Sequence, residues 1–159
     1  MTRNTTIIKT PIGKLTISEH NGFITLCEFT NKATCVNKTS SVLAAATDQL
    51  SDYFKGHRIK FDLPLATTGT PFQKMVWRVL QSIPCGETWS YQELAKKVGN
   101  AKAARAVGTA NAKNKICIFI PCHRVILATG KVGNYSGGKV RKIKLLDLEQ
   151  QALTNNYLG

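Results

Sequence analysis

The pattern of apolar residues changes at residues 62–69, and this change limits the possible folds more than any other feature of the sequence. Before it, three β-rich runs cover residues 5–10, 14–19 and 23–29, separated by the turn sequences PIG and HNG. Such runs predict a small antiparallel sheet. After it, the sequence is typical of helices. The segment DLPLATTG between them resembles a linker, so we expect two domains, residues 1–64 and residues 65–159.

Polar residues with capping chemistry mark where the helices should begin. Ser40 or Ser41 begins a helix that Gly56 ends. Thr70, followed by Pro71, begins the first helix of the second domain. The remaining helices are expected at residues 90–98, at about 102–111, and from about 138 onward. Two short helices around a turn that contains glycine predict a helix-turn-helix.

Three later segments complete the predicted secondary structure. The apolar run ICIFI at residues 116–120 suits a buried strand, and it ends abruptly at PCHRV. Residues 128–138 contain four glycines, so we expect a flexible loop there. The closing helix has Val140, Ile143 and Leu146 at steps of three, which puts them along one side of it.

Positive charge is concentrated in the second domain. The chain has 22 Lys and Arg against 9 Asp and Glu, a net charge of +13. Residues 1–64 hold eight basic and five acidic side chains, net +3, whereas residues 65–159 hold fourteen and four, net +10. Between Leu94 and Leu146 there are twelve basic residues and no carboxylate. A solvated helix face usually mixes both signs, so this stretch predicts contact with a polyanion, with DNA or RNA favoured over an anionic membrane.

Composition and cysteine spacing argue against several classes of protein. Apolar residues make up 43% of the chain, too many for a wholly disordered protein. No apolar run approaches the roughly 20 residues of a membrane span, and the N-terminus lacks a secretory signal, so we expect an intracellular protein. The five cysteines are irregularly spaced without a Cys-x-x-Cys pair, which argues against a disulfide framework or a zinc ribbon.

Cys122 is the cysteine with the strongest indication of chemistry. It follows a proline at the end of the apolar run, and His123 and Arg124 come directly after it. Nearby cations favour the thiolate, which is the nucleophilic form of cysteine. A Cys-His dipeptide alone fits a small core residue equally well, because adjacent side chains on an extended chain point apart. The surrounding basic stretch and the glycine-rich loop favour the nucleophile.

Several motifs follow one another across the second domain. They are TPFQ at residues 70–73, SYQELA at 90–95, KAARAVG at 102–108, Asn114, IPCHRV at 120–125 and GNYSGG at 133–138. In this order and spacing they resemble the motifs of the O6-alkylguanine-DNA alkyltransferases, the suicide DNA-repair proteins. The resemblance is strong over residues 70–150 and weak before them. The inactive branch of that family lacks the acceptor cysteine, which this chain keeps as Cys122.

The resemblance implies an α/β (α+β) fold and a reaction. A small ribonuclease-H-like domain of a sheet and a helix would precede a winged helix-turn-helix domain. The protein would repair DNA directly, moving the alkyl group of O6-alkylguanine irreversibly to Cys122 after flipping the base out of the duplex. O4-alkylthymine is a second candidate substrate. Each molecule would act once as a methylated-DNA–protein-cysteine methyltransferase, and no cofactor is implied because the protein itself accepts the group.

The resemblance also assigns catalytic roles to individual residues. Cys122 would attack the alkyl carbon, His123 would take the thiol proton through a bound water, and Glu149 would hold the imidazole in the required tautomer. Tyr91 would donate a proton to the departing guanine. Asn114 would connect the helix-turn-helix to the active-site segment.

Further residues would bind the flipped base. The backbone N–H of Ser136 would face O6, and the backbone carbonyls of Cys122 and Val125 would accept from the exocyclic amine. Tyr135 belongs to the same substrate-binding group.

The resemblance implies a specific mode of DNA binding. The second helix of the helix-turn-helix would lie in the minor groove of double-stranded DNA, and Arg105 would fill the gap that the flipped nucleotide leaves. Binding would be nearly independent of sequence and sensitive to salt. A monomer that can cluster on DNA is expected, in the cytoplasm of a prokaryote or the nucleus of a eukaryote. The other DNA-facing residues would be Tyr91, Gln92, Asn100, Ala103, Ala104 and Gly108.

Two other classes of protein remain open at this point. One is a winged-helix DNA-binding protein in which Cys122 is inert. The other is a thiol hydrolase or redox sensor that uses Cys122 with His123, and Cys117 as a resolving thiol would support it. That second class leaves the basic stretch unexplained.

A structural metal is not expected. Some members of the family hold zinc in the N-terminal domain, but His20, Cys27 and Cys35 form only a partial set of ligands here, and we interpret them as structural.

Overall fold

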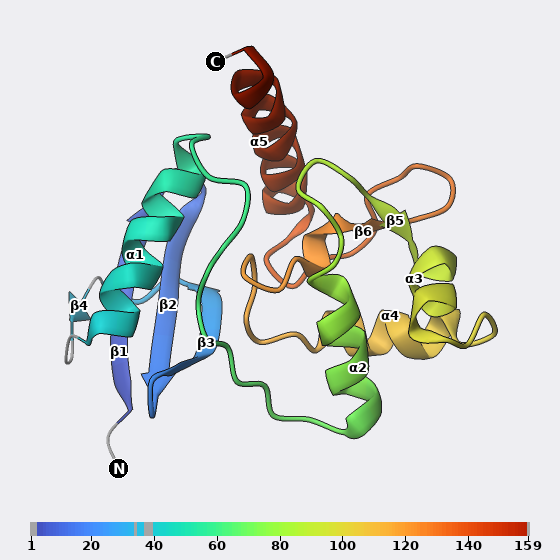
Figure 1. Ribbon diagram of the computed structural model, residues 1–159, viewed down its shortest axis with the longest axis horizontal. Coiled ribbons are helices and arrows are strands. Elements are labelled where there is room, and N and C mark those ends of the chain that lie inside the picture. The colour runs from blue at the N-terminus through green and yellow to red at the C-terminus, as the bar shows by residue number, and fades with distance from the viewer. Residues whose placement is uncertain (1–2, 34, 37–39, 159) are drawn as a thin grey trace.

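The computed structural model describes residues 3–33, 35–36 and 40–158 (Figure 1). A sheet with one helix packed on it forms the N-terminal part, and a group of helices forms the C-terminal part beside it (Figure 1). This is the mixed α/β fold that the sequence predicts. Within the described residues, no helix is long and apolar enough to cross a bilayer.

The N-terminal sheet is antiparallel, with the strand order β3-β2-β1-β4. Three strands confirm the prediction, and the two-residue strand β4 adds to it. Asn21 and Gly22 form the tight turn between the second and third strands with φ angles of 53° and 84°, a conformation that Asn and Gly adopt most readily. The strands are β1 (Asn4–Thr10), β2 (Gly13–His20), β3 (Phe23–Thr30) and β4 (Cys35–Val36).

Helix α1 (Ser41–Phe54) packs against the sheet, as its apolar spacing predicts. The side chain of Ser40 caps it by accepting a hydrogen bond from the backbone N–H of Leu43. Its buried side chains are Leu43, Ala46, Leu50 and Tyr53. Tyr53 lies in the last turn of α1, where it contacts the C-terminal part of the chain.

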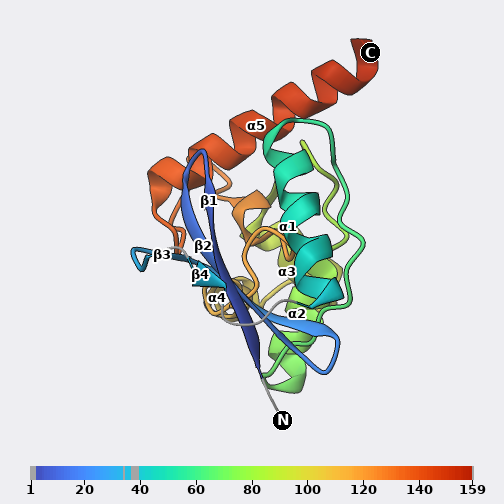
Figure 2. The same cartoon turned by 90° about the vertical axis from the view of Figure 1, so that its left-hand side faces the viewer.

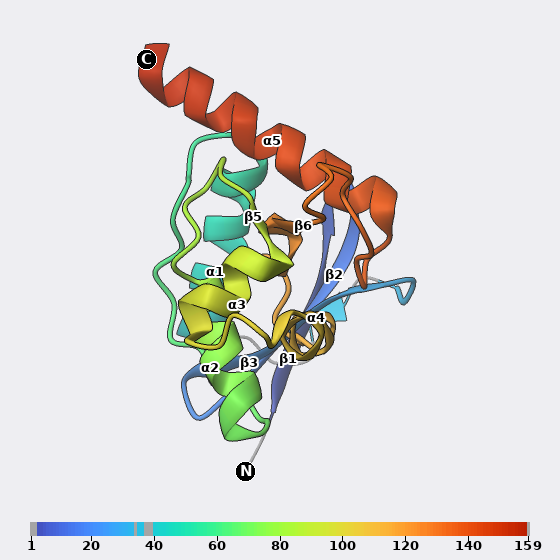
Figure 3. The same cartoon turned by 90° about the vertical axis from the view of Figure 1, so that its right-hand side faces the viewer.

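The C-terminal part contains three short helices that pack against one another, α2 (Pro71–Leu80), α3 (Tyr91–Val98) and α4 (Ala104–Ala112) (Figure 3). Thr70 and Ser90 begin the first two, as predicted, and the structure shows a capping box at each. Gly99, with φ 100°, ends α3 and begins the turn to α4, which completes the helix-turn-helix. Helix α4 begins slightly later than predicted, after Ala103, which offers no side-chain cap.

The edge strand β3 joins the two parts. The backbone N–H of Ile24 donates to the carbonyl of Pro64 at 2.8 Å, so the predicted linker runs along this strand. The backbone N–H of Cys27 donates to the carbonyl of Lys115 at 2.9 Å, and the backbone carbonyl of Cys27 accepts from the N–H of Cys117 at 2.8 Å. The segment that leads to Cys122 is therefore held against the sheet, and the open edge of the sheet is covered.

Residues 116–120 do not form the buried strand that their apolar run predicts. They make a tight turn in which Cys117 and Ile120 pair as an isolated bridge and Ile118 has φ 74°. The turn is buried under β3 and under Phe61. The centroid of the Phe61 ring lies 4.9 Å from that of Phe119. A run of apolar residues shows that a segment is buried, but it does not distinguish a strand from a buried turn.

The closing helix α5 (Lys139–Leu158) runs along the end of the N-terminal part (Figure 2). The apolar side chains noted in the sequence do not face the core, since Val140 is 66% exposed and Ile143 is 44% exposed. The buried side chains are instead Lys142, Leu145, Glu149 and Ala152. Two charged residues can occupy this face because partners far away in the chain form hydrogen bonds with them.

Candidate active site and nucleic-acid interface

Cys122 lies at the start of a short 3₁₀ turn, η1 (Cys122–Arg124), which follows the buried turn. Strand β6 (Val125–Ile126) continues from it and pairs in parallel with β5 (Trp89–Ser90), directly before α3. This pairing brings the first residue of α3, Tyr91, close to the thiol. Both side chains line one cavity of about 730 Å³, which is large enough for a small-molecule site.

Three segments form the walls of this cavity. They are α3 with Tyr91, α4 with Arg105 and Gly108, and the glycine-rich loop with Tyr135 and Ser136. Cys122 lines the cavity although only 3% of its surface is exposed. The structure thus brings the predicted nucleophile, the predicted proton donor and the predicted substrate loop to one place.

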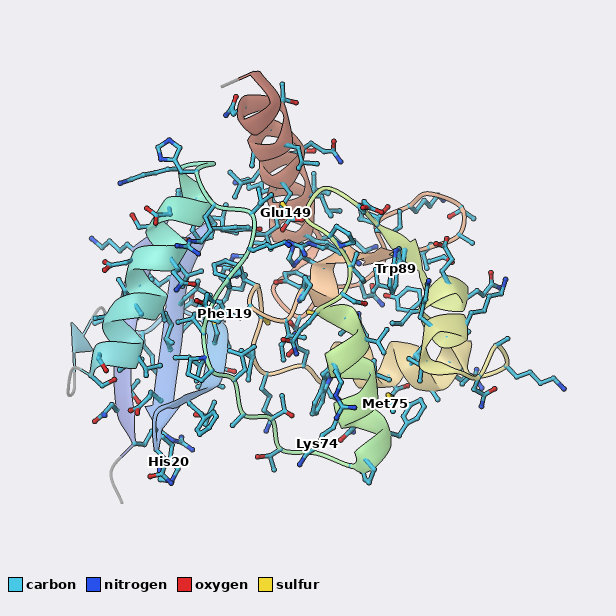
Figure 4. The ribbon with its side chains drawn as sticks, viewed as in Figure 1. His20, Lys74, Met75, Trp89, Phe119 and Glu149 are labelled. Carbon is cyan, nitrogen blue, oxygen red and sulfur yellow. The ribbon has the colours of Figure 1, made fainter. Side chains whose placement is uncertain are left out.

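Behind Cys122, a buried carboxylate collects hydrogen bonds from three side chains. Glu149 extends from α5 into the space between the two parts of the chain (Figure 4). Its Oε2 accepts from His123 Nε2 at 2.7 Å, and Arg124 donates to both of its oxygens at 2.9 Å. The hydroxyl of Tyr53 donates to Oε2 at 2.6 Å. Arg124 is itself held by the carbonyl of Ile83 at 2.6 Å.

These partners keep Glu149 ionised. Burial alone would raise its pKa, but the attraction and hydrogen bond of His123, together with those of Arg124, hold the pKa well below its usual range. A carboxylate is an acceptor only, so the proton in the bond to His123 lies on Nε2. Nδ1 is buried and has no hydrogen-bond partner among the described residues. In the neutral imidazole this nitrogen is therefore the one free to accept a proton.

The surroundings of Cys122 do not favour the thiolate, contrary to the expectation from the neighbouring cations. The side chain of Arg124 donates its hydrogen bonds to Glu149 and not to the sulfur of Cys122. The hydrogen bond with Cys117, and then burial, raise the pKa of Cys122 well above its usual value, although Asn114 and the charge of Lys142 oppose the shift. A thiol of this kind needs a base to become a nucleophile, which increases the importance of His123.

Two asparagines divide the role that the sequence assigned to one. Asn114 accepts from the N–H of Ile116 and donates to the carbonyl of Ile120, each at 2.9 Å, so it closes the buried turn. Asn111 makes a further connection, from α4 to the active-site segment, by donating to the carbonyl of Cys122 at 3.3 Å. The sequence analysis missed Asn111. Its position four residues after the buried Val107, on the buried face of α4, was the available signal.

Asn114→Ala is expected to lower the free energy of unfolding by about 1–3 kcal/mol, because the buried N–H of Ile116 loses its acceptor and the carbonyl of Ile120 loses one of its two donors. Urea denaturation at neutral pH measures the change. Asn155→Ala, at an exposed position of α5, provides the control. A loss no larger than that of the control would show that the turn holds its shape without Asn114.

Lys142 is a second functional candidate that the sequence did not indicate. Its ammonium is buried and donates to the carbonyls of Val125 at 2.6 Å and Asn134 at 3.1 Å. Burial lowers its pKa to about 8, while Cys122 opposes the shift. Lys142 thus connects the substrate loop to β6 and orients the Val125 carbonyl, which keeps a second lone pair for a ligand.

The loop over the cavity contacts both domains. The ring of Tyr135 lies edge-on to Phe29 of β3 at 6.5 Å and to His123 at 6.4 Å. The hydroxyl of Ser136 is 3.6 Å from the sulfur of Cys117. These contacts hold residues 133–138 close to the thiol.

The face of the helix-turn-helix beside the cavity has the predicted polar and small residues. Arg105, Gln92 and Asn100 are exposed, and Asn100 accepts a hydrogen bond from the N–H of Lys102 at 3.1 Å. Tyr91 is half-buried at the cavity wall, and burial raises its pKa. The small residues of this face, all half-buried, are Ala103, Ala104 and Gly108.

The remaining cysteine and histidine predictions concern the N-terminal part. Cys27 lies in the core of the sheet, where burial raises its pKa. The side chain of Cys35 lies outside the described residues. Across the part of the chain that the structure describes, no three His, Cys, Asp or Glu side chains come together as a metal site.

Two family models match the chain. Residues 4–67 match the ribonuclease-like domain of 6-O-methylguanine DNA methyltransferase, and residues 71–151 match its DNA-binding domain. The chain belongs to this family. Curated relatives include the methylated-DNA–protein-cysteine methyltransferase of Mycobacterium tuberculosis, 45% identical over 90% of each chain. The constitutive enzyme of Bacillus subtilis is 43% identical over 91% of this chain and 94% of its own.

Solved structures of the family have the same architecture. The crystal structure of Mycobacterium tuberculosis O6-methylguanine methyltransferase superimposes with a TM-score of 0.86 at 41% identity, covering 95% of this chain and 94% of that one. A crystal structure of Mycobacterium tuberculosis OGT in complex with DNA gives a TM-score of 0.84 at 43% identity, covering 92% of each chain.

Proposed function

We propose that the protein repairs DNA by transferring an alkyl group from O6 of guanine to its own Cys122. Membership of the methyltransferase family gives the reaction class, a methylated-DNA–protein-cysteine methyltransferase. One observation supports the assignment of the acceptor most directly. The thiol of Cys122 opens into a cavity beside the helix-turn-helix, and the ring of the adjacent His123 is bonded to a buried, ionised Glu149.

The proposed step needs no group beyond those on the chain and the DNA. The sulfur forms a bond to the alkyl carbon as the bond from that carbon to O6 breaks, and the electron pair leaves with guanine. The thiol proton goes to Nδ1 of His123 through a bound water, and Tyr91 donates to the departing base. The products are a thioether at Cys122 and unmodified guanine. A thioether is not hydrolysed under these conditions, so each molecule acts once.

The same cavity suits a base that has left the duplex. The backbone N–H of Ser136 would face O6, and the carbonyls of Cys122 and Val125 would accept from the exocyclic amine. The carbonyl of Cys122 already accepts from the side chain of Asn111 and from the backbone N–H of Val125, and the carbonyl of Val125 accepts from Lys142. These donors fix the direction of each carbonyl. O4-alkylthymine is a second candidate for this cavity.

DNA is the partner, and we propose a specific arrangement on it. Helix α4 enters the minor groove, where its half-buried Ala103, Ala104 and Gly108 permit a close approach. The charge of +10 in residues 65–159 provides contacts to phosphates that do not depend on sequence. The protein would act as a monomer, with clustering on DNA as a possible extension, inside the cell where the genome lies.

Arg105→Ala is expected to slow transfer from duplex DNA by about tenfold, because filling the gap left by a flipped base offsets part of the unstacking cost of a few kcal/mol. Transfer from a free O6-alkylguanine base should change far less. Single-turnover rates on both substrates measure the difference. The control is Arg78→Ala, which removes an exposed arginine from α2. Equal slowing on both substrates would contradict a role in base flipping.

Intact-protein mass spectrometry tests the proposed function itself. The protein is incubated with a duplex that contains O6-methylguanine, and it is then digested so that peptide mapping can locate the modification. The expected result is the gain of one methyl group in place of one hydrogen on Cys122, with unmodified guanine left in the DNA. An unchanged mass in spite of DNA binding would overturn the proposal and leave a DNA-binding protein with an inert cysteine.

A further inference from the structure

Tyr53 connects the N-terminal part of the chain to the buried carboxylate of Glu149. It lies in the last turn of α1, and only 1% of its surface is exposed. Its hydroxyl donates to Oε2 of Glu149 at 2.6 Å across 96 positions of sequence. The rings of Phe54 and Phe61 lie 5.2 Å from its own ring on two sides, so the side chain has one well-defined direction.

Tyr53 donates to the same oxygen of Glu149, Oε2, that accepts the hydrogen bond of His123. Oε2 of Glu149 accepts from Tyr53, from His123 Nε2 and from one nitrogen of Arg124, whereas Arg124 is the only donor to Oε1 among the residues that the structure describes. Arg124 sets the plane of the carboxylate with two parallel bonds. Tyr53 approaches from the opposite domain and limits the movement of Oε2 in the buried space behind Cys122.

Tyr53 stays protonated and can therefore donate to Glu149. Burial, and then the charge and hydrogen bond of Glu149, raise the pKa of Tyr53 well above its usual value, so the hydroxyl keeps its proton. The titratable groups that interact with Glu149 come from three segments. They are Tyr53 of α1, His123 and Arg124 of η1, and Cys85 of the segment after α2.

We propose that Tyr53 is a positioning residue for alkyl transfer. It holds Oε2 of Glu149 where it accepts from Nε2 of His123, so that Nδ1 stays turned toward the thiol of Cys122. The N-terminal part is then a component of the active site. This inference rests on the proposed function, since it assigns Tyr53 a place in that reaction.

Tyr53→Phe removes the donor and keeps the aromatic contacts. We expect the single-turnover rate on a duplex with O6-methylguanine to fall by about tenfold, the size of effect seen when a partner that orients a catalytic ligand is lost. The affinity for unmodified duplex should stay unchanged. The acid limb of the pH–rate profile should move to higher pH, because Oε2 without Tyr53 attracts the protonated imidazole more strongly. A purely structural role would not move this limb.

The matched control is Ser51→Ala, which removes an exposed hydroxyl two residues earlier in the same helix. Rates are compared at a temperature where circular dichroism shows every variant folded. Should the phenylalanine variant not fold, 3,5-difluorotyrosine at position 53 keeps the hydroxyl as a stronger donor and should move the acid limb to lower pH. A rate within twofold of wild type with an unmoved pH profile would overturn the inference, and so would an unmoved profile with difluorotyrosine.

A second measurement separates this inference from the proposed function. Nitrogen-15 NMR of the imidazoles reports the tautomer of His123 in the free protein without DNA, with His20→Gln and His57→Gln variants for assignment. We expect the Nε2–H form in wild type and a shifted Nε2 signal in Tyr53→Phe. Failure of the wild type to methylate Cys122 would contradict the proposed function alone. An unchanged imidazole signal in Tyr53→Phe would overturn the positioning role alone.

Discussion

Cys122→Ser is expected to abolish alkyl transfer and to leave DNA binding intact. A serine hydroxyl has nearly the shape of the thiol but is a far weaker nucleophile, because it is much less acidic than a thiol. The bonds that form η1 are backbone bonds, and they do not depend on the sulfur. The rate constant should therefore fall by at least about a thousandfold, which corresponds to roughly 4 kcal/mol of transition-state stabilisation. Intact mass after incubation with an O6-methylguanine duplex measures the loss.

The control for this variant is another buried cysteine. Cys27→Ala removes a thiol from the core of the sheet, outside the cavity that Cys122 lines. It should cost some stability and keep single-turnover methylation of Cys122. Methyl transfer to the Cys122→Ser protein at a different residue would show that the acceptor has been assigned wrongly.

Glu149→Gln is expected to be the most destabilising single change in the site. The amide of glutamine cannot balance the charge of Arg124, which is buried and donates to the carbonyl of Ile83. The amide also places an N–H₂ group, itself a donor, among side chains that donate. Breaking a buried ion pair on one side costs about 3–5 kcal/mol. Urea denaturation measures the loss, with Asp147→Asn, at an exposed position of the same helix, as the control. A loss below about 1 kcal/mol would contradict the view that Glu149 organises the centre of the protein.

The same residue predicts how stability depends on pH. The pKa of Glu149 is depressed in the folded state, so its contribution is complete above the unfolded value of about 4.3 and is lost as the pH falls below it. Wild-type protein should therefore lose stability on acidification more steeply than Glu149→Gln does. Parallel curves of unfolding free energy against pH for the two proteins would argue against this assignment.

Short-range chemistry made a large part of the fold predictable. Thr70 and Ser90 begin their helices with capping boxes, and Gly99 ends α3, because each of these signals depends only on residues within one turn. The strands of the N-terminal sheet follow from β-rich runs between turn residues for the same reason. The candidate site was also accessible from the sequence, since Cys122, Tyr91 and the substrate loop lie in motifs that resemble one family. Their individual roles remain predictions.

Tertiary structure decided where the chain buries its polar groups. Residues 116–120 form a turn because β3 and Phe61 cover them, and Lys142 and Glu149 lie inside because the carbonyl of Val125 and the side chains of Arg124 and Tyr53 meet them there. Asn111 contacts the active-site segment only because the helix-turn-helix packs on it. A buried charge is stable only with partners, and these partners lie up to 96 positions away in sequence. The sequence by itself therefore determined the local elements and the acceptor motif, whereas the network that can activate the acceptor exists only where distant segments meet.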